Sequence, residues 1–462
     1  MKFVDRDREL RTLQQEYART SSSMVIIYGR RRVGKTELIR HFIEDKPSLY
    51  FLATEESEAM NREAFQQLTA DFLDNDLLRD SVLTRWEPIF QQLAQAAEKQ
   101  RLIIVIDEFQ YIGKSDPAFL SVFQRIWDTI LQNANIMLIL CGSLVSMMMS
   151  QTLNQSSPLY GRRTAQLHVR PIPFAHYHEF FPSSFSQEEL IKRYSITGGV
   201  PKYIEMFAKD EELAKAVQKS ILTPSSFLFD EPTFLLQKEV SDIGSYFSIL
   251  RVIAAGNHKL SKIAAMLQQK QTNLPRYLNV LIDLDLLARD VPVTENNPAK
   301  SKKGIYQIRD NFIRFWFQFI YPNRSYLEMG HTDIVLNRLK RNFIDNQVSF
   351  VYEQICQEKL WSLSAEGTLP GLLERVGRWW DNAHEIDVVG LSEADQLLVL
   401  GECKFWAGPV GMNVLTTLEQ KAAFVDWHKE TRKTMYILFS IHGFSEDLRA
   451  AAAVRKDVLL IS

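Results

Sequence analysis

Four runs of apolar, β-prone residues occur early in the chain, at 24–28, 47–53, 102–106 and 136–141. A helical pattern from about 56 to 100 separates the second run from the third. Continuous apolar runs of this length are typical of strands buried on both faces of a parallel sheet. Strands that alternate with helical segments predict a doubly wound α/β core.

The alternation stops near residue 207, and a polar, mostly helical stretch to about 240 predicts a connector or lid. The next segments have apolar-periodic helices and then short β-type runs, at 243–255, 260–267, 273–287, 291–293 and 304–308. Three helices followed by a two-stranded wing resemble the winged-helix family. We therefore expect domains at 1–206, 207–240, 241–322 and 323–462.

An aromatic segment closes the third of these domains. Its rings at Phe312, Phe315, Trp316 and Phe319 follow helical spacing. Such a stripe is more often a helix buried between domains than a platform for stacking nucleic-acid bases, so we expect packing. Pro322–Asn323 then marks a boundary.

Composition narrows the class of protein further. The chain has 462 residues, of which 46% are apolar, enough for several buried cores. Its net charge of −2 neither favours nor excludes nucleic acid, because such binding depends on local patches. Three cysteines without metal-ligand spacing fit a reducing compartment. No signal peptide or membrane-length apolar run is evident, so we expect a soluble, cytoplasmic protein without a membrane partner.

The strongest chemical signal follows the first apolar run, where Gly29-Arg-Arg-Arg-Val-Gly34-Lys35-Thr36 matches the phosphate-loop pattern. Glycines let backbone N–H groups converge on an anion, and the next helix directs its positive end to the same point. Lys35 adds a cation, and Thr36 supplies a hydroxyl for Mg²⁺. The sequence predicts an ATP–Mg²⁺ site.

Acidic residues emerge where the third run ends. Asp107 is expected to hold Mg²⁺ and Glu108 to activate the attacking water, at the edge where parallel sheets keep their ligands. Ser143, after the fourth run, either senses the γ-phosphate or attacking water, or only caps a helix. An additional strand between the loop strand and the acidic strand is typical of a hydrolysing, AAA-like NTPase.

These segments together resemble the archaeal-type ATPase family of the STAND and AAA+ group, over roughly the first half of the chain. The shared motifs are Phe3-Val-Asp-Arg6, the Arg-rich loop, Asp107-Glu108-Phe-Gln110, Tyr160-Gly-Arg162-Arg163, Pro171-Ile-Pro-Phe174 and Gly198-Gly-Val-Pro201. The resemblance implies that the opening segment packs beside the nucleotide base, that Arg162 lies near the γ-phosphate, and that Pro201 couples nucleotide state to the next domain. We expect at least one loop arginine to be solvated. The predicted nucleotide-binding set is Gly29, Arg30, Arg31, Arg32, Val33, Gly34, Lys35, Thr36, Glu37, Arg6 and Pro201.

A second constellation lies in the last domain, where the β-type runs 385–391 and 397–405 flank a polar turn. If they pair as a hairpin, Asp387 faces Glu402 or its neighbour, and Lys404 shares a face with Glu402. This pattern resembles the PD-(D/E)XK nuclease core, and Glu353 matches that family's leading acidic helix residue. Asp387 and Glu402 would hold Mg²⁺, while Lys404 orients or deprotonates water. Glu385 crowds the site, and no proline precedes Asp387; a structural salt-bridged hairpin is the alternative.

The third domain offers Gln271 and Arg276 for a DNA groove and Lys300, Lys302 and Lys303 for phosphates, although such domains also serve only as packing modules. The function predicted is a Mg²⁺-dependent ATP-binding and ATP-hydrolysing switch coupled to a DNA-binding half with a nuclease-like domain, and the sequence leaves open whether that domain cleaves DNA. One alternative is a non-nucleolytic regulatory scaffold whose second half contacts protein. Another is a ring-forming homo-oligomeric motor in which Arg162 acts across a subunit boundary.

Overall fold

The computed structural model describes residues 2–208 and 211–462, which form two compact units that interleave along the chain. Unit 1 contains the chain up to His176 together with Gly199–Glu205 and Thr233–Ser241. Unit 2 contains Tyr177–Gly198, Met206–Pro232 and Asp242–Ser462. The predicted connector at 207–240 is therefore divided between the units, and its residues 209–210 lie outside the described part. The four-domain division stays a prediction.

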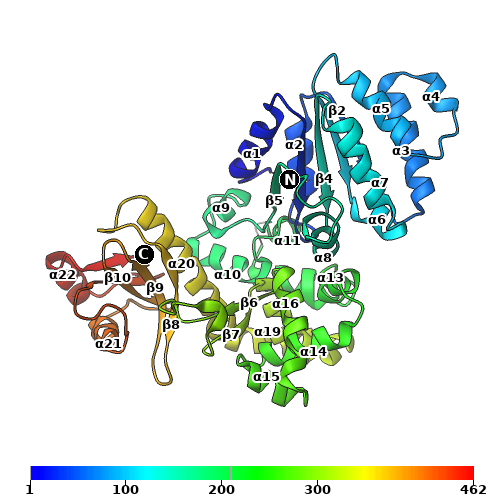
Figure 1. Ribbon diagram of the computed structural model, residues 1–462. Helices are drawn as coiled ribbons and strands as arrows, with labels where there is room; N and C mark the ends of the chain where they lie inside the picture. Colours follow the sequence, from blue (N-terminus) through cyan, green and yellow to red (C-terminus); the bar gives the residue numbers. More distant parts are fainter. Residues whose placement is uncertain (1, 209–210) are drawn as a thin grey trace. The chain divides into compact units, whose positions relative to one another are not determined.

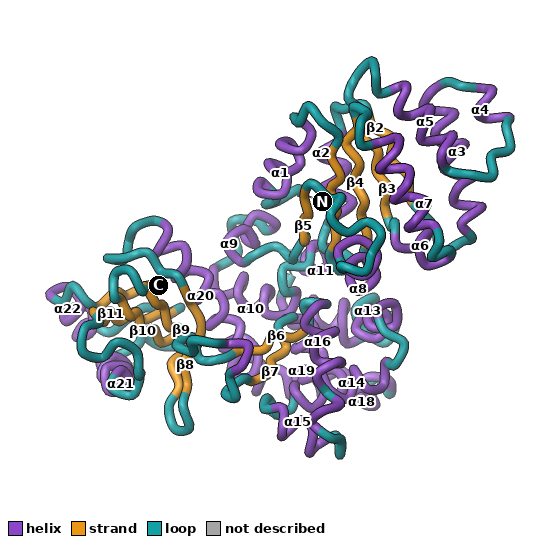
Figure 2. Tube along the Cα trace, in the orientation of Figure 1, coloured by secondary structure: helices purple, strands orange, loops and turns teal. Residues whose placement is uncertain are grey.

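Unit 1 is built on a five-stranded parallel sheet with the order β2-β3-β4-β1-β5 (Figures 1 and 2). Its strands are β1 Ser23–Tyr28, β2 Ser48–Leu52, β3 Leu102–Asp107, β4 Ile136–Gly142 and β5 Ala165–His168. The predicted α/β class is confirmed, and β4 separates β1 from the acidic strand β3 as expected. The fifth strand, β5, was not predicted.

Several of the helices of unit 1 pack on the two faces of this sheet, and the others pack around them. The helices are α1 Asp7–Tyr17, α2 Lys35–Ile43, α3 Glu58–Leu73, α4 Asp76–Asp80, α5 Glu87–Ala96, α6 Gln110–Ser115, α7 Phe119–Ile126, α8 Val145–Met148 and α13 Glu231–Glu239, with short α9 Phe174–Tyr177 and α11 Pro201–Phe207 at the unit boundary. Leu13 of α1 and Leu38 of α2 pack on Val25 and its neighbours. The alternate sheet residue Ile26 is equally buried, so both faces are covered. The helical stretch predicted at 56–100 is three helices.

The first part of unit 2 is mainly helical. Its helices are α10 Gln187–Thr197, α12 Leu213–Val217, α14 Ile243–Ala254, α15 Leu260–Met266, α16 Pro275–Asp283, α17 Asn311–Phe315, α18 Arg324–Glu328 and α19 Thr332–Phe343. A two-stranded antiparallel sheet, β6 Leu287–Asp290 and β7 Ile305–Ile308, follows α16. The predicted order of three helices and two strands is present. The first strand was wrongly placed at 291–293: Pro292 has no N–H to donate, and the pairing uses the preceding residues.

The aromatic segment packs as expected. Phe312, Phe315, Trp316 and Phe319 are all buried in unit 2, and the indole N–H of Trp316 donates to the Phe229 carbonyl oxygen at 2.7 Å. This hydrogen bond satisfies the one polar group of a ring that is otherwise surrounded by apolar side chains. The segment is thus core and not a stacking surface.

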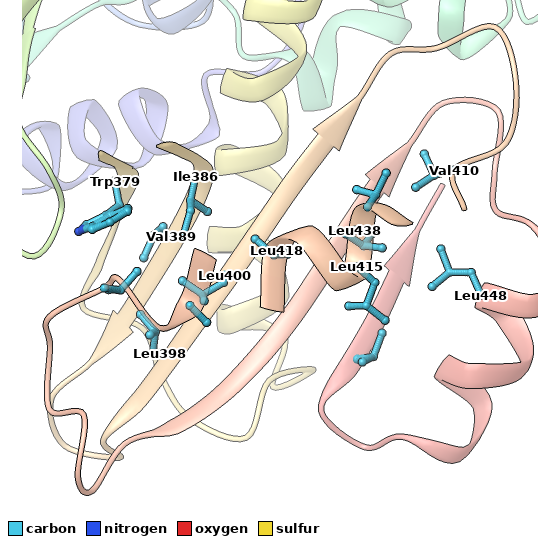
Figure 3. Packing of buried hydrophobic residues seen from close by; sticks show 14 of the residues in the cluster. Trp379, Ile386, Val389, Leu398, Leu400, Val410, Leu415, Leu418, Leu438 and Leu448 are labelled. Atoms are coloured by element: carbon cyan, nitrogen blue, oxygen red, sulfur yellow. The ribbon is translucent and has the colours of Figure 1, made fainter. Parts of the chain in front are cut away.

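The last part of unit 2 carries a mixed sheet with the order β12-β11-β10-β9-β8. Its elements are α20 Ser349–Ala365, β8 Arg375–Trp380, β9 Glu385–Ser392, β10 Leu397–Lys404, α21 Met412–Ala422, β11 Lys433–Ser440, α22 Glu446–Val454 and β12 Val458–Ile461. Strands β8 to β10 are antiparallel, whereas β11 and β12 run parallel to β10. Leu415 and Leu418 of α21 and Leu448 of α22 pack on the sheet residues Leu400 and Leu438 (Figure 3).

Among the described helices, none is both long and apolar enough to cross a bilayer.

Candidate active site

The phosphate loop joins β1 to α2 and folds tightly against the end of β5. Gly29 has φ 152°, and a β-carbon there would collide with the Val169 carbonyl oxygen. Gly34, with φ 95°, precedes the first turn of α2. Lys35 is buried, and its Nζ donates to the carbonyl oxygens of Gly29 and Arg30 at 2.7 and 3.0 Å. Burial lowers the pKa of Lys35, while the nearby Glu108 and Asp107 oppose that effect.

The predicted metal-binding residues lie together. Thr36 Oγ1 donates to Asp107 Oδ2 at 3.0 Å, and the Tyr50 hydroxyl donates to the same oxygen. Burial raises the pKa of Tyr50, and its hydrogen bond to Asp107 adds to that rise. Tyr50 therefore stays a neutral donor that fixes the carboxylate. No local pattern indicated this role, because Tyr50 reaches Asp107 only through the pairing of β2 with β3.

Glu108 is held by side chains from two other elements. The Ser143 hydroxyl donates to the Glu108 carboxylate at 2.7 Å, and the Ser143 backbone N–H donates to its Oε2 at 3.1 Å. The Gln110 side chain donates to Oε2 as well. Glu108 also has φ 53°, a left-handed backbone conformation that is costly for a residue with a side chain. Ser143 does not cap α8, so the sensing role is the one that this geometry favours.

The opening segment contacts the phosphate loop, whereas its expected packing beside the nucleotide base stays a prediction. Arg6 is buried, and its Nη2 donates to the carbonyl oxygens of Val33 at 2.9 Å and Arg170 at 2.8 Å. It also pairs with Glu9. Arg6 thus ties the phosphate loop to the segment that follows β5.

The loop arginines are less solvated than expected. Arg30 is buried and Arg31 and Arg32 are half-buried, so the prediction that at least one lies in solvent is wrong. Arg31 Nη2 donates to the Tyr111 hydroxyl at 2.8 Å, which explains its position. Glu37 of α2, by contrast, is exposed.

Pro201 comes back to the loop from far along the chain. A β-carbon on Gly34 would lie 3.9 Å from Pro201 Cγ, so the ring lies against the loop. The Ile172 N–H donates to the Gly199 carbonyl at 2.8 Å, and Gly199 has φ 71° where a β-carbon would collide with Ile172. Glycine is required here by both backbone conformation and space.

Arg162 lies at the opposite edge of the sheet from the phosphate loop. Its guanidinium donates twice to the Asp128 carboxylate, at 2.8 and 2.7 Å. Arg162 precedes β5, and the Thr164 N–H donates to Met24 at the amino end of β1. This position does not agree with the prediction that Arg162 lies near the γ-phosphate, because the loop follows the carboxyl end of β1. Action across a subunit boundary stays a prediction.

A glycine-rich loop with Lys35 and Thr36, facing Asp107 and Glu108 at the carboxyl edge of a parallel sheet, defines a P-loop ATPase domain. The family model described as an ATPase domain predominantly from Archaea matches residues 3–207. A protein of Methanocaldococcus jannaschii called "Uncharacterized protein MJECL04" is 36% identical over 406 residues, covering 87% of each chain. The chain therefore belongs to this family of archaeal-type ATPases.

Other comparisons agree with this assignment. A model described as archaeal and bacterial proteins of unknown function matches residues 316–420. "Uncharacterized ATP-binding protein MJ0423" of M. jannaschii is 48% identical over 44 residues, which are 10% of this chain and 75% of that protein. The solved Walker-type ATPase PABY2304 of Pyrococcus abyssi has a TM-score of 0.53 at 20% identity, covering 68% of this chain and 96% of that one. That likeness supports the fold.

The second constellation assembles in unit 2. Strands β9 and β10 form the predicted hairpin, and the Cys403 N–H donates to Asp387 Oδ2 at 3.0 Å. Lys404 Nζ lies 2.7 Å from Glu402 Oε1. Burial alone would lower the pKa of Lys404, but Glu402 outweighs it and raises the pKa. Burial, with repulsion from Glu402, raises the pKa of Asp387.

Two cations that sequence reasoning missed complete this cluster. Lys421 of α21 places Nζ 3.2 Å from Glu402 Oε2, and Arg378 of β8 lies 3.5 Å from Glu353. Burial raises the pKa of Glu353 to about 8; Arg378 opposes that rise, whereas Asp387 and Glu385 add to it. Across residues 2–208 and 211–462, no group of three or more His, Cys, Asp and Glu side chains is arranged to hold a metal ion.

The glutamine and the basic residues predicted to contact DNA are exposed. Gln271, Arg276, Lys300, Lys302 and Lys303 all face solvent. Arg276 lies over the Tyr277 ring, and Lys303 pairs with Glu295 at 2.8 Å. The segment between β6 and β7 also packs on β8, because the Val293 N–H donates to the Arg378 carbonyl at 2.9 Å. Part of this segment therefore serves packing within unit 2.

Proposed function

We propose that unit 1 binds ATP with Mg²⁺ and hydrolyses it, and that the nucleotide state acts as a switch for the second half of the chain. The observation that carries this proposal is the convergence of Lys35, the Thr36–Asp107 pair and the Glu108–Ser143 pair at one sheet edge. Each supplies a different part of phosphoryl transfer: phosphate binding, metal binding and orientation of water.

The donor set of the metal site fits Mg²⁺, since the Thr36 hydroxyl and the Asp107 carboxylate are hard oxygen ligands 3.0 Å apart. These two residues would hold the ion, which neutralises phosphate charge when bound. Lys35 exchanges its carbonyl partners for phosphate oxygens, and Glu108 accepts a proton from water while Ser143 keeps the carboxylate in place.

Phosphate release tests this part of the proposal. We expect Lys35→Ala to abolish binding and turnover, and Glu108→Gln to retain ATP binding while losing at least about a hundredfold in kcat. Glu44→Gln, which changes an exposed carboxylate at the far end of α2, is the matched control and should resemble the unchanged protein. Equal phosphate release by the unchanged protein and Lys35→Ala would defeat the proposal.

For the second half, we infer a nuclease-like activity on DNA. Asp387, Glu402 and Lys404 lie together on β9 and β10, with Glu353 on the preceding helix. Asp387 and Glu402 are donors of the kind that Mg²⁺ prefers and would hold the ion, which stabilises charge on a phosphodiester when bound. Lys404 would orient water or the phosphate.

Plasmid nicking in Mg²⁺ or Mn²⁺ tests this inference. Lys404→Ala should lose nicking, whereas Lys456→Ala, which removes an exposed lysine of the same sheet domain, should keep it. Nicking that persists equally in both variants would assign it to a contaminant.

The packing of Val293 on β8 favours a second candidate, a regulatory scaffold whose second half makes protein contacts. DNA affinity separates the two. If Lys300, Lys302 and Lys303 contact phosphates, replacing all three by Ala should reduce the slope of log K against log salt by about 3. An unchanged slope, or no binding by the unchanged protein, supports the scaffold.

A further inference from the structure

Glu239, the last residue of α13, lies in unit 1 although it follows residues 3–207, the range that the ATPase family model matches. The Val145 N–H, just after Ser143, donates to Glu239 Oε1 at 3.2 Å. Glu239 Oε2 is buried and accepts no hydrogen bond from the described residues. Ser143, Val145 and Glu239 all belong to unit 1, so the contact between Val145 and Glu239 lies inside one compact unit.

The cations that stabilise this carboxylate are those of the phosphate loop. Arg31 and Lys35 both act electrostatically on Glu239 and favour its charged form. Lys35 is also the residue proposed to bind phosphate. Glu239 and a triphosphate therefore draw on the same two positive charges.

Two polar contacts attach the end of α13 to the rest of unit 1, in addition to the buried Leu235 and Leu236, and the contact made by Glu239 is the more buried of the two. The neighbouring Lys238 pairs with Glu55 at 3.1 Å, but both side chains are about half exposed. Exposed ion pairs of this kind contribute little. Unit 1 ends at Ser241, two residues after Glu239, and the next residue, Asp242, begins a segment of unit 2. Any displacement of Glu239 is thus passed directly to that segment.

We infer that Glu239 competes with ATP for the phosphate-loop cations, so that nucleotide binding loosens the end of α13 from unit 1. This inference rests on the proposed ATP site and adds the residue that reports its occupancy. A triphosphate brings several negative charges towards Arg31 and Lys35, and the repulsion between it and a largely buried carboxylate is only weakly screened. Docked Glu239 and bound ATP therefore disfavour each other, and the coupling is reciprocal.

Affinity measurements on the full chain test the inference. Glu239→Gln keeps the shape and removes the charge, so the Kd for a fluorescent ATP analogue should fall by about fivefold. Glu55→Gln is the control, since it cuts the tether of Lys238 without touching a partner of Lys35, and its Kd should stay within about twofold of the unchanged protein. An unchanged or raised Kd in Glu239→Gln overturns the inference.

Hydrogen exchange of the unchanged protein provides a test that needs no variant. Amides of residues 233–241 should exchange at least about tenfold faster with a non-hydrolysable ATP analogue than without it. Slower or equal exchange with bound analogue overturns the inference. If the analogue does not bind at all, the proposed ATP site fails first, and the affinity measurement distinguishes that outcome.

Discussion

At the residue scale, the most constrained group is Glu108. Its backbone adopts φ 53°, and its carboxylate accepts from the Ser143 hydroxyl, the Ser143 N–H and the Gln110 amide. A general base is effective only when it is held in reach of the water it activates. Ser143 acts through Glu108 and is therefore a positioning residue.

Ser143→Ala should consequently lower kcat for ATP hydrolysis by about tenfold while leaving the Kd for ATP nearly unchanged. Ser143→Thr retains the hydroxyl and should recover much of the rate. Ser150→Ala, which removes an exposed hydroxyl from the helical segment Met149–Leu153, is the control. A rise in Kd that matches the fall in kcat would assign Ser143 to nucleotide binding instead.

Glu239 gives a pH dependence at the same scale. Burial raises its pKa to about 7; the Val145 and Ser146 N–H groups and the cations Arg31 and Lys35 oppose the rise. Because this lies above the ordinary value, the folded protein holds the proton longer than the unfolded chain does. The stability it contributes is complete at low pH and is lost as pH rises through about 7.

Denaturant unfolding at several pH values should show this loss. Relative to Glu239→Gln, the unchanged protein should lose about 1–3 kcal/mol of unit 1 stability between pH 5 and 8. Glu55→Gln provides a contrast: Lys114 and Lys238 hold the pKa of Glu55 below its usual range, so the contribution of Glu55 is lost only at lower pH and should stay constant between pH 5 and 8. A difference that does not vary with pH would mean that Glu239 is charged throughout.

At the scale of elements, the decisive contact is the close approach of the phosphate loop to the segment after β5. A side chain at Gly29 would meet the Val169 carbonyl, and the φ of 152° is itself unfavourable. Gly161 also has a positive φ, 80°, but has open space around it. Substitution of Gly161 therefore tests backbone strain alone, whereas substitution of Gly29 adds a steric collision.

Gly29→Ala should destabilise unit 1 by at least about 2 kcal/mol, against about 1 kcal/mol for Gly161→Ala. Chemical denaturation of both variants measures the difference. Equal losses would show that the loop can move away from Val169 without cost.

The sequence predicted those elements whose signals are local. The apolar run at 102–106 and the loop at 29–36 each contain their own information, and the structure places both as expected. Strand β5 was missed because only Leu167 of its four residues is buried, so it has no apolar run. Lys421 and Glu239 were missed because their roles depend on contacts between elements far apart in the chain, which no local pattern encodes.

At the scale of the whole molecule, the chain passes between the two units repeatedly, and both later segments that join unit 1 end at the nucleotide site. Gly199–Glu205 brings Pro201 to Gly34, and Thr233–Ser241 brings Glu239 to Val145. The predicted contiguous ATPase domain at 1–206 did not anticipate this interleaving. Each of these two segments of unit 1 continues directly into unit 2, so a change in its contacts at the proposed nucleotide site would reach the chain of unit 2, as the proposed switch requires.

The hydrophobic cores nevertheless remain separate, since the cluster around Val25 and Leu38 lies in unit 1 and the cluster around Leu400 and Leu418 lies in unit 2. We therefore expect calorimetry to resolve two unfolding transitions. A non-hydrolysable ATP analogue with Mg²⁺, at a hundred times its Kd, should stabilise only the unit 1 transition, by about 2.7 kcal/mol. Lys35→Ala should abolish that shift and leave the other transition in place. A single cooperative transition, or equal shifts of both transitions, would mean that the two units unfold together because the interleaved segments couple them strongly. A nucleotide-driven rearrangement between the units would then be disfavoured.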